Sequence, residues 1–421
     1  MVEFLSLSKD AFGLEITDTT VRVMKFALRG GKAVAVSAGL ASIAPGIMKD
    51  GDIKDENGLV GAIKEAVGGL SGERIKTKRV VVSLPENKSF LQVIKMPKLR
   101  DEDLRAAVVF EAENYIPLPL EKVYLDYEIV PAASSQVDDG GCEVLIAAFP
   151  REAVDARVQA VVKAGLVPVA MELESQAAAR VIFAGKISQP PTVIFQIGDD
   201  RTNLIVYSEN SIRLTFSIPI SNSYFLETIA QSAQVDMKEA DVLKTKRGIE
   251  EFARMSDGNQ TDDLSDSPQF GAEQRKIFEA LVPGLVDLVQ QAKKCLQYYQ
   301  THETGRGMSQ APIERILICG SGSDLLGLDE FIALKLNTRV ERVSPQVCMK
   351  AVEGIASRQS LCGFAVAGGL AMRALYGDKL PSLNSPAAVI RGSARERINN
   401  AVGTASPKRN MSKPRRIKIG S

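Results

Sequence analysis

The sequence predicts an α/β protein whose two similar halves face each other across a cleft. Its 421 residues are enough for two or more domains, and a hydrophobic content of 45% is ample for packed cores. The third observation is an internal near-repeat, because residues 13–18 and 195–199 both close an apolar strand and open a polar hairpin. Each hairpin is followed by β-rich and then helical sequence, so both hairpin loops are expected at one cleft.

The first half is expected to open with strands and to continue with a helix. Apolar residues predict a strand over residues 12–26, interrupted by the polar run at 17–20, and another over 33–40 after the turn at Gly30-Gly31. Leu59, Ile63 and Val67 have helical spacing and predict a helix over 57–69. The β-branched run at 79–84 predicts a buried strand.

Residues 86–148 are expected to form an inserted module. They contain a predicted strand (90–96), a helix (101–115), a proline-rich turn (116–120) and two further strands (123–130 and 143–149). Helices are then predicted over 151–164 and 174–183.

The strand pattern restarts at Thr192, after a linker over residues 184–191. One strand is predicted to stop at Ile197, a second to start at 204–206 and a third to cover 212–220. Helical sequence follows at 222–250 and 278–300, with a polar, acidic stretch at 255–273 that is expected to be a loop. A strand at 315–319 ends in the glycine turn 320–323, and a helix is predicted from Leu328.

Charge and cysteine content bound the environment. Lys+Arg 52 against Asp+Glu 51 shows no global bias toward nucleic acid or membranes, although Pro381 to Ser421 hold nine Lys/Arg and one acidic residue, a formal charge of +8. Five scattered cysteines without a CxxC spacing favour a reducing compartment and no metal site. With no signal-peptide pattern and no apolar run of ~18 residues, the protein is expected in the cytoplasm.

The hairpin after Ile197 has the form of a phosphate-binding loop. Gly198 and the polar residues 199–202 lie between two strands, and their backbone N–H groups are suited to cradle phosphate. Two such loops at one cleft would grip the phosphates of a nucleotide from both sides.

Several stretches make the chain similar to the actin/Hsp70-like ATPase fold, and most of all to the PilM family of type IV pilus assembly. The sequence FEAENYIPLPL at residues 110–120 resembles the family's EAExYIPFPL, and CLQYY at 295–299 resembles its SLQFY helix end. Further similar stretches, in the same order, are APGI at 44–47 with GDI at 51–53, VVVSLP at 80–85 and VYLDY at 123–127. The resemblance covers about residues 10 to 378 and extends more distantly to FtsA.

The resemblance implies a subdomain division. Subdomain 1A would take residues 1–85 and 149–190, the inserted 1C-type subdomain 86–148, subdomain 2A 191–221 and subdomain 2B 222–300. Residues 301–378 would complete 2A and return to 1A, and the basic tail 379–421 is expected to be disordered.

The resemblance also implies a nucleotide site whose metal chemistry is weakened. The first phosphate loop of such proteins has Asp-x-Gly where this chain has Glu15 and Thr17, followed by Asp18 and Thr19 as further candidate groups. The second has Asp where this chain has Gln196, an amide that cannot hold hydrated Mg²⁺ as an anion does. The remaining loop residues are Gly198, Asp199, Asp200 and Arg201.

Three further elements match the family's site. Glu174 corresponds to the glutamate that orients the attacking water, Asp241 and Lys244 to a helix that meets the ribose or adenine, and Gly320 and Gly322 to the adenosine glycine turn. Structural alternatives stay open for each. Glu174 also fits an ordinary first-turn acid of a helix, Asp241 and Lys244 a solvated i,i+3 pair, and the glycines a plain turn. Glu15 and Gln196 also fit polar strand ends, and the proline-rich turn at 115–120 also fits a packed corner that ends a helix. ATP with Mg²⁺ is therefore expected to bind weakly or not at all.

Three functions compete at this level. The first is a PilM-like cytoplasmic scaffold at the inner face of the membrane, which binds a peptide of a PilN-like inner-membrane protein through Tyr115, Ile116 and Leu118. The second is an active actin-like ATPase with Glu174 as its catalytic residue, disfavoured by Glu15 and Gln196, and the third is an FtsA-like membrane tether. Self-association stays open and no specific nucleic-acid contact is expected. The charge of the basic tail is suited to an anionic membrane surface, while binding to nucleic acid or a merely solvated tail fits equally well.

Overall fold

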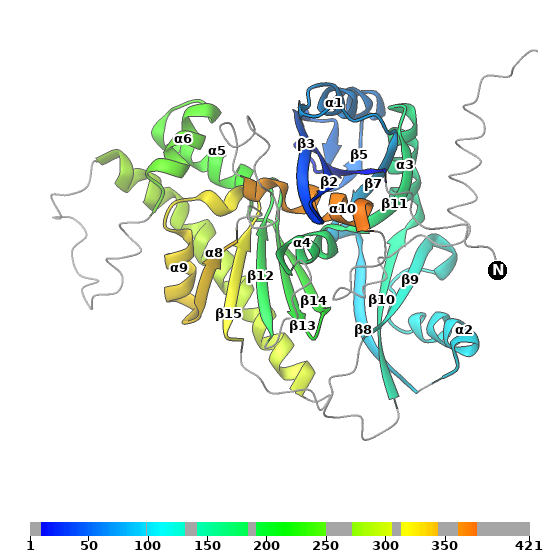
Figure 1. The fold of residues 1–421 in the computed structure, drawn as a ribbon. Coiled ribbons are helices and arrows are strands. Elements are labelled where there is room, and N and C mark those ends of the chain that lie inside the picture. The colour runs from blue at the N-terminus through cyan, green and yellow to red at the C-terminus, as the bar shows by residue number, and fades with distance from the viewer. Residues whose placement is uncertain are drawn as a thin grey trace, which may run out of the picture.

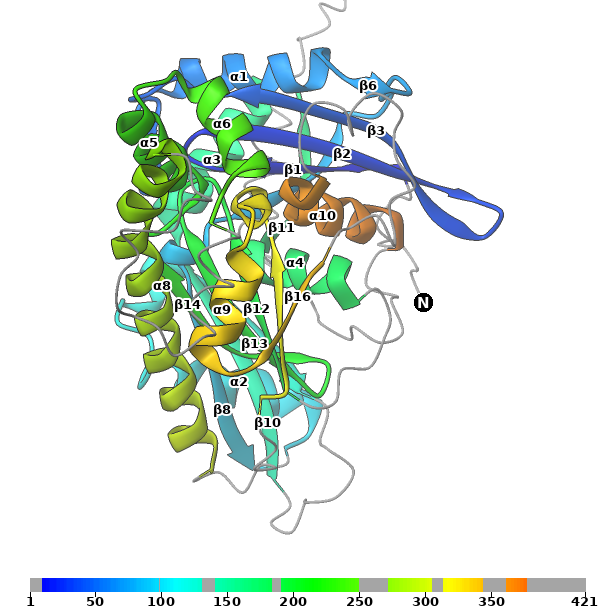
Figure 2. The same ribbon diagram turned by 90° about the vertical axis from the view of Figure 1, so that its left-hand side faces the viewer.

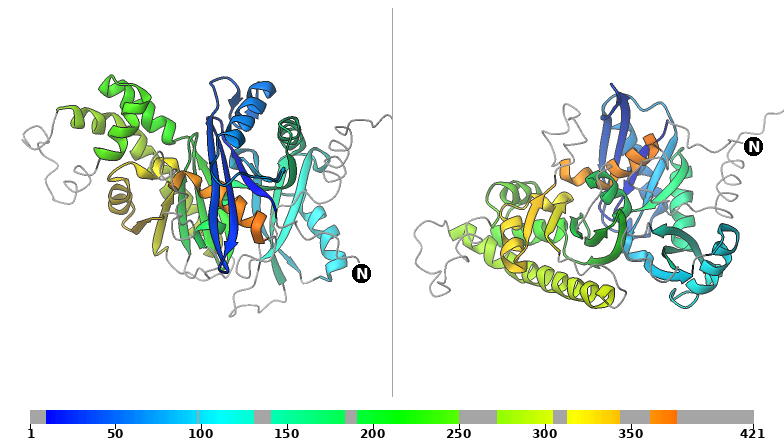
Figure 3. Two further views of the ribbon diagram at one scale, coloured as in Figure 1. Left: turned by 45° about the horizontal axis from the view of Figure 1, so that its top comes forward. Right: turned by 60° about the horizontal axis from the view of Figure 1, so that its bottom comes forward.

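The computed structural model describes residues 10–97, 99–130, 141–183, 191–249, 272–304, 313–343 and 361–376. The linker at 184–190, most of the acidic stretch 255–273 and the basic tail 379–421 lie outside these ranges. Two α/β halves lie side by side, with a smaller three-stranded unit against them (Figures 1 and 3).

The first half is built on a six-stranded sheet in the order β11-β7-β1-β2-β3-β6. Its strands are β1 (Phe12–Ile16), β2 (Thr20–Arg29), β3 (Lys32–Ser42), β6 (Ser71–Gly72), β7 (Arg79–Leu84) and β11 (Val167–Leu173). β1 pairs antiparallel with β2 and parallel with β7, so the sheet is mixed. A short ribbon of β4 (Met48–Lys49) and β5 (Asp52–Ile53) stands apart.

The second half repeats this topology with five strands in the order β14-β13-β12-β15-β16. They are β12 (Thr192–Ile197), β13 (Thr202–Ser208), β14 (Ser211–Ile218), β15 (Arg315–Cys319) and β16 (Arg339–Arg342). β12 pairs antiparallel with β13 and parallel with β15, as β1 does with β2 and β7. The predicted pair of similar α/β halves is thereby confirmed.

Helices cover both faces of the two sheets. α1 (Glu56–Gly68) and α3 (Arg151–Lys163) pack on the outer face of the first sheet, while α4 (Glu174–Phe183) and α10 (Ala365–Tyr376) lie between the halves (Figure 2). α5 (Asn222–Ala233), α6 (Met237–Lys246), α8 (Ala272–Thr304) and α9 (Leu328–Leu336) cover the outer face of the second sheet. Short 3₁₀ turns occupy Glu86–Lys88, Leu120–Lys122, Ser321–Asp324 and Leu361–Phe364.

Small residues let the last helix return to the first half. A Cβ added to Gly369 of α10 would lie 1.8 Å from the carbonyl oxygen of Ala177 in α4, and one added to Gly13 would lie 2.4 Å from that of Ala367. These glycines therefore allow the backbones of α10, α4 and β1 to touch. The contact closes the core on the cleft side of the first sheet.

The insert is a three-stranded antiparallel sheet in the order β8-β10-β9, with α2 (Asp101–Ala112) on one face. Its strands are β8 (Phe90–Pro97), β9 (Val123–Val130) and β10 (Gly141–Pro150). The buried Arg213 of β14 pairs with Glu143 of β10 at 2.5 Å and with Glu209 at 2.5 Å. The insert thus contacts the second half as well as the first.

Candidate functional site

The two polar hairpins meet between the halves, where the near-repeat places them. Thr17 to Thr19 connect β1 to β2, and Gly198 to Arg201 connect β12 to β13. In the first loop the buried Thr17 makes the turn with its side chain, because its Oγ1 accepts the N–H of Thr20 at 3.0 Å. In the second, Gly198 N–H donates to the carbonyl of Arg201 at 2.8 Å.

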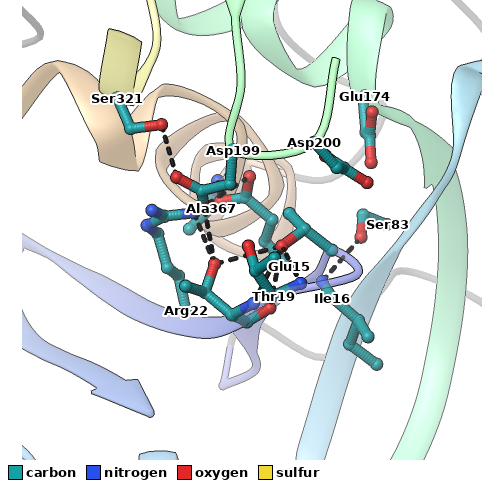
Figure 4. A network of polar contacts seen from close by, with 12 residues as sticks. Glu15, Ile16, Thr19, Arg22, Ser83, Glu174, Asp199, Asp200, Ser321 and Ala367 are labelled. Carbon is teal, nitrogen blue, oxygen red and sulfur yellow. Dashed lines mark hydrogen bonds and ion pairs between the residues drawn. The ribbon is translucent and has the colours of Figure 1, made fainter. Parts of the chain in front are cut away.

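Asp199 joins the loops at the centre of the site (Figure 4). Its Oδ2 lies 2.7 Å from Nη1 of Arg22 and accepts the hydroxyl of Thr20 at 2.7 Å, while its Oδ1 accepts the hydroxyl of Ser321 at 2.5 Å. Burial alone would raise the pKa of Asp199, but the guanidinium of Arg22 and these hydrogen bonds lower the pKa to about 2. Asp199 is therefore a buried anion fully satisfied by the protein.

Asp200 reaches across to the other loop. Its Oδ2 accepts the backbone N–H of Asp18 at 3.3 Å, a donor that a phosphate loop would offer to its ligand. Burial raises the pKa of Asp200 to about 6, with the negative charges of Asp18 and Asp199 acting in the same direction. Arg201 turns away from the loops to Asp50, at 3.7 Å.

Glu15 ends β1 beneath this network. It is buried, its Oε2 accepts the N–H of Ala367 at 3.3 Å, and its Oε1 lies 3.8 Å from Nη1 of Arg22. Burial raises the pKa of Glu15 to about 7 even though Arg22 acts against it. Close to neutral pH this carboxyl group is therefore only partly ionised.

Glu174 and Gln196 share a neighbour. The Asn203 amide donates to Oε2 of Glu174 at 3.2 Å and to Oε1 of Gln196 at 2.8 Å. Burial raises the pKa of Glu174 well above its ordinary value, and the nearby Asp200 and Glu15 raise it further. Burial and these neighbouring charges therefore both disfavour the ionised form of Glu174.

The expected adenosine side is tightly packed. Gly320 has φ +95°, and a Cβ there would lie 2.2 Å from the carbonyl of Ile197; one at Gly322 would lie 2.4 Å from the Ile197 side chain. These glycines fit the turn against β12. The ammonium of Lys244 is buried beneath the turn, 2.9 Å from Asp241, and Asp324 and Asn222 lie 2.8 and 2.7 Å from it.

This arrangement fits a magnesium nucleotide poorly. The structure brings predicted nucleotide residues of both halves to one site, but the N–H of Asp18 and the cations of Arg22 and Lys244 bind other protein groups. Among the described residues, no group of three or more Asp, Glu, His or Cys side chains is placed to hold a metal ion. No helix in the described ranges is long and apolar enough to cross a bilayer.

Arg22 is the central residue that sequence reasoning missed. It lies on β2 between Val21 and Val23, is buried, contacts both Glu15 and Asp199, and lies over the ring of Phe364 at 5.9 Å from its centroid. The sequence feature that could have indicated it is an arginine flanked by two valines in a predicted strand.

The predicted partner residues lie elsewhere, in the turn after α2. Tyr115 and Leu118 are 43% and 41% exposed, and Phe110 on α2 is 73% exposed. Ile116 is only 7% exposed and belongs to the core of the insert with Leu104 and other residues. Of the three predicted partner residues, Tyr115 and Leu118 are therefore the accessible ones, and Ile116 lies beneath them in the core of the insert.

The chain matches the family model described as type IV pilus assembly protein PilM over residues 13–254. Among solved structures it is similar to the PilM-PilN type IV pilus biogenesis complex, with a TM-score of 0.67 and 25% identity over 87% of this chain and 98% of that one. It also matches the ethanolamine utilization protein EutJ from Carboxydothermus hydrogenoformans (TM-score 0.45, 14% identity, 87% and 89% covered). A third match is MreB5 of Spiroplasma citri bound to ADP (TM-score 0.44, 12% identity, 87% and 97% covered). The duplicated topology is that of the predicted actin/Hsp70-like ATPase fold.

Proposed function

Because the chain belongs to the PilM family of type IV pilus assembly proteins, we propose that it acts in the pilus machinery as a scaffold rather than as an ATPase. It binds a short cytoplasmic peptide of a PilN-like inner-membrane protein, and this contact keeps it at the inner face of the cytoplasmic membrane. The similarity to a solved PilM-PilN complex supports this choice of partner.

One observation carries the scaffold proposal: the two loops bind each other with the groups that would hold phosphate. The N–H of Asp18 donates to the Asp200 carboxylate, and the cation of Arg22 is paired with Asp199. A nucleotide would have to displace both contacts before it gained any of its own. This supports weak or absent nucleotide binding.

The charge at the site argues in the same direction. Arg22 is one cation among the carboxyl groups of the buried Glu15 and Asp199 and the partly buried Asp200. At an effective dielectric constant of about 20, two like charges ~4 Å apart repel by ~4 kcal/mol. A triphosphate would therefore meet electrostatic repulsion from these carboxylates.

Peptide capture is assigned to the exposed apolar side chains of the insert. Phe110, Tyr115 and Leu118 are exposed on α2 and on the turn after it, and Pro117 and Pro119 restrict that turn. A rigid apolar surface loses little conformational entropy when a partner orders on it.

The test is capture of the purified full chain by an immobilised N-terminal cytoplasmic peptide of a PilN-like protein from the same organism. Tyr115→Ala and Leu118→Ala should each weaken capture by roughly tenfold or more, as expected for anchor residues, while the melting temperature stays unchanged. Met237→Ala, at an equally exposed side chain of α6, is the control and should bind normally.

Ile116→Ala provides the opposite pattern. Since Ile116 is buried, its truncation should cost ~2–5 kcal/mol of unfolding free energy and affect capture only through stability. If Tyr115→Ala and Leu118→Ala both capture the peptide like the unaltered protein, the docking surface lies elsewhere. MgATP turnover that Glu174→Ala abolishes would favour the active ATPase instead.

A further inference from the structure

One end of the first sheet has a concentrated positive charge. Residues 25–32 at the β2–β3 hairpin and residues 73–79 before β7 contain seven Lys/Arg and one acidic residue, Glu73. The hairpin projects beyond the sheet at its tip, Gly30-Gly31 (Figure 2). Residues 73–79 cross the base of the same end, since Glu73 N–H bonds to Val36 and Thr77 Oγ1 donates to the carbonyl of Asp10.

Most of this charge is not neutralised. Lys25 pairs with Asp10 and Arg29 with Glu73. The other five basic residues form no ion pair within the described part of the chain, and all five are exposed: Lys32, Arg74, Lys76, Lys78 and Arg79. Next to them Leu28 is 52% exposed near the hairpin tip. An apolar side chain at the tip of a basic projection suits an interface with a polar, anionic layer over an apolar one.

The last helix leads the chain toward the same end. Ala367 of α10 bonds to Glu15, and Ala371 lies against Gly13, so α10 runs opposite to β1 and away from the cleft. The helix ends at Tyr376, after which the sequence has the +8 segment from Pro381 to Ser421. The last described residue, Tyr376, therefore lies toward the same end of the first sheet as residues 25–32 and 73–79.

We infer that this end, defined by residues 25–32 and 73–79, binds an anionic phospholipid surface directly. Each basic residue near such a surface contributes roughly a fivefold increase in binding, so five unpaired ones make a strong electrostatic contact. Nucleic acid fits less well, because single strands stack on exposed aromatic side chains and the one aromatic residue here, Phe26, is buried. The inference is independent of the peptide and of nucleotide binding.

The chain contains no tryptophan, so a single one can report the contact. The full-length Leu28→Trp variant should show a blue-shifted emission with vesicles that contain about one-third phosphatidylserine, and none with pure phosphatidylcholine. Raising the salt concentration should reverse the shift through screening. Met237→Trp, exposed on α6 in the other half, is the control and should not shift.

Charge reversal tests the surface without removing the tail. Arg74→Glu, Lys76→Glu and Lys78→Glu together should weaken vesicle co-sedimentation of the full chain by about 100-fold, from roughly fivefold per residue. The control reverses Lys238, Lys293 and Lys294, which are equally exposed and change the net charge equally, and should weaken it far less.

Four outcomes would overturn the inference. If both triple variants lose the same amount of vesicle binding, the total charge of the protein drives binding. If neither variant loses any, binding belongs to the tail. A failure of the unaltered protein to bind anionic vesicles would remove the surface altogether. If the triple variant at Arg74, Lys76 and Lys78 loses binding to a labelled RNA but still binds vesicles, the surface is one for nucleic acid. Because the vesicles contain no protein, none of these results bears on the scaffold proposal.

Discussion

Arg22 holds the two halves together at the candidate site, and its removal should be costly. Its side chain and that of Asp199 are each 6% exposed, with 2.7 Å between Nη1 and Oδ2, and Glu15 lies 3.8 Å away. Arg22→Met keeps much of the side-chain volume but leaves the Asp199 carboxylate without its counter-ion. Removing one partner of a buried pair typically costs ~3–5 kcal/mol, because an uncompensated charge stays buried. Because both side chains are almost fully buried, water screens the charge of the pair little.

The assay is urea unfolding monitored by circular dichroism, with Arg275→Met as control. Arg275 pairs with Glu279 on the surface of α8, where an exposed pair contributes ~0–1 kcal/mol. Adding Asp199→Asn to Arg22→Met should recover part of the loss, because the pair is then neutral. A loss below ~1 kcal/mol for Arg22→Met, or no recovery in the double variant, would refute the view that this ion pair fastens the halves.

Further predictions concern the candidate site and the helices that pack around the first sheet. Phosphate release from MgATP should not exceed a protein-free control, and turnover abolished by Glu174→Ala would contradict this. Asp200→Gly frees a loop N–H, so MgATP should raise its melting temperature more than that of the unaltered protein. Gly369→Ala should lower the free energy of unfolding by ~3 kcal/mol or more, because its Cβ would clash with the backbone of α4. Gly61→Ala on α1 is the control: its Cβ would meet no atom within 4 Å, so the change should raise the free energy of unfolding by ~0.5–1 kcal/mol, as measured by calorimetry. Folding raises the pKa of Glu15 from 4.5 to about 7, so the folded state binds more protons than the unfolded state between these two pH values. The free energy of unfolding should therefore fall as the pH rises through this range. Glu15→Gln should flatten this pH dependence in urea titrations.

Strong local patterns made most of the fold predictable. The helix over 174–183 and the strand over 315–319 match the structure, since each has an uninterrupted pattern. α10 was not predicted, because Gly368-Gly369 lowers helix propensity and only contact with α4 explains it. β16 was missed because two arginines and a glutamate in four residues do not resemble a strand.

The site was predictable as a cluster of loops but not in its internal pairing. Alternation along β2 suggests that Arg22 faces solvent, whereas the sheet is covered on both faces and the guanidinium is buried. Lys244 fits a solvated i,i+3 pair by spacing and is instead buried under the glycine turn. In both cases the missing information was which distant segment covers the side chain.

Buried ion pairs join the second half both to the first sheet and to the insert. At the cleft, Asp199 joins Arg22 of the first half to Ser321 of the second. At the insert, the buried Arg213 of β14 joins Glu143 of β10 to the second half. Rotation of the halves would break both sets of buried charges, each expensive to leave unpaired. The protein's own ion pairs thus favour this arrangement of the halves, which supports the proposal of a scaffold that presents its partner surface without a cycle of nucleotide binding and hydrolysis.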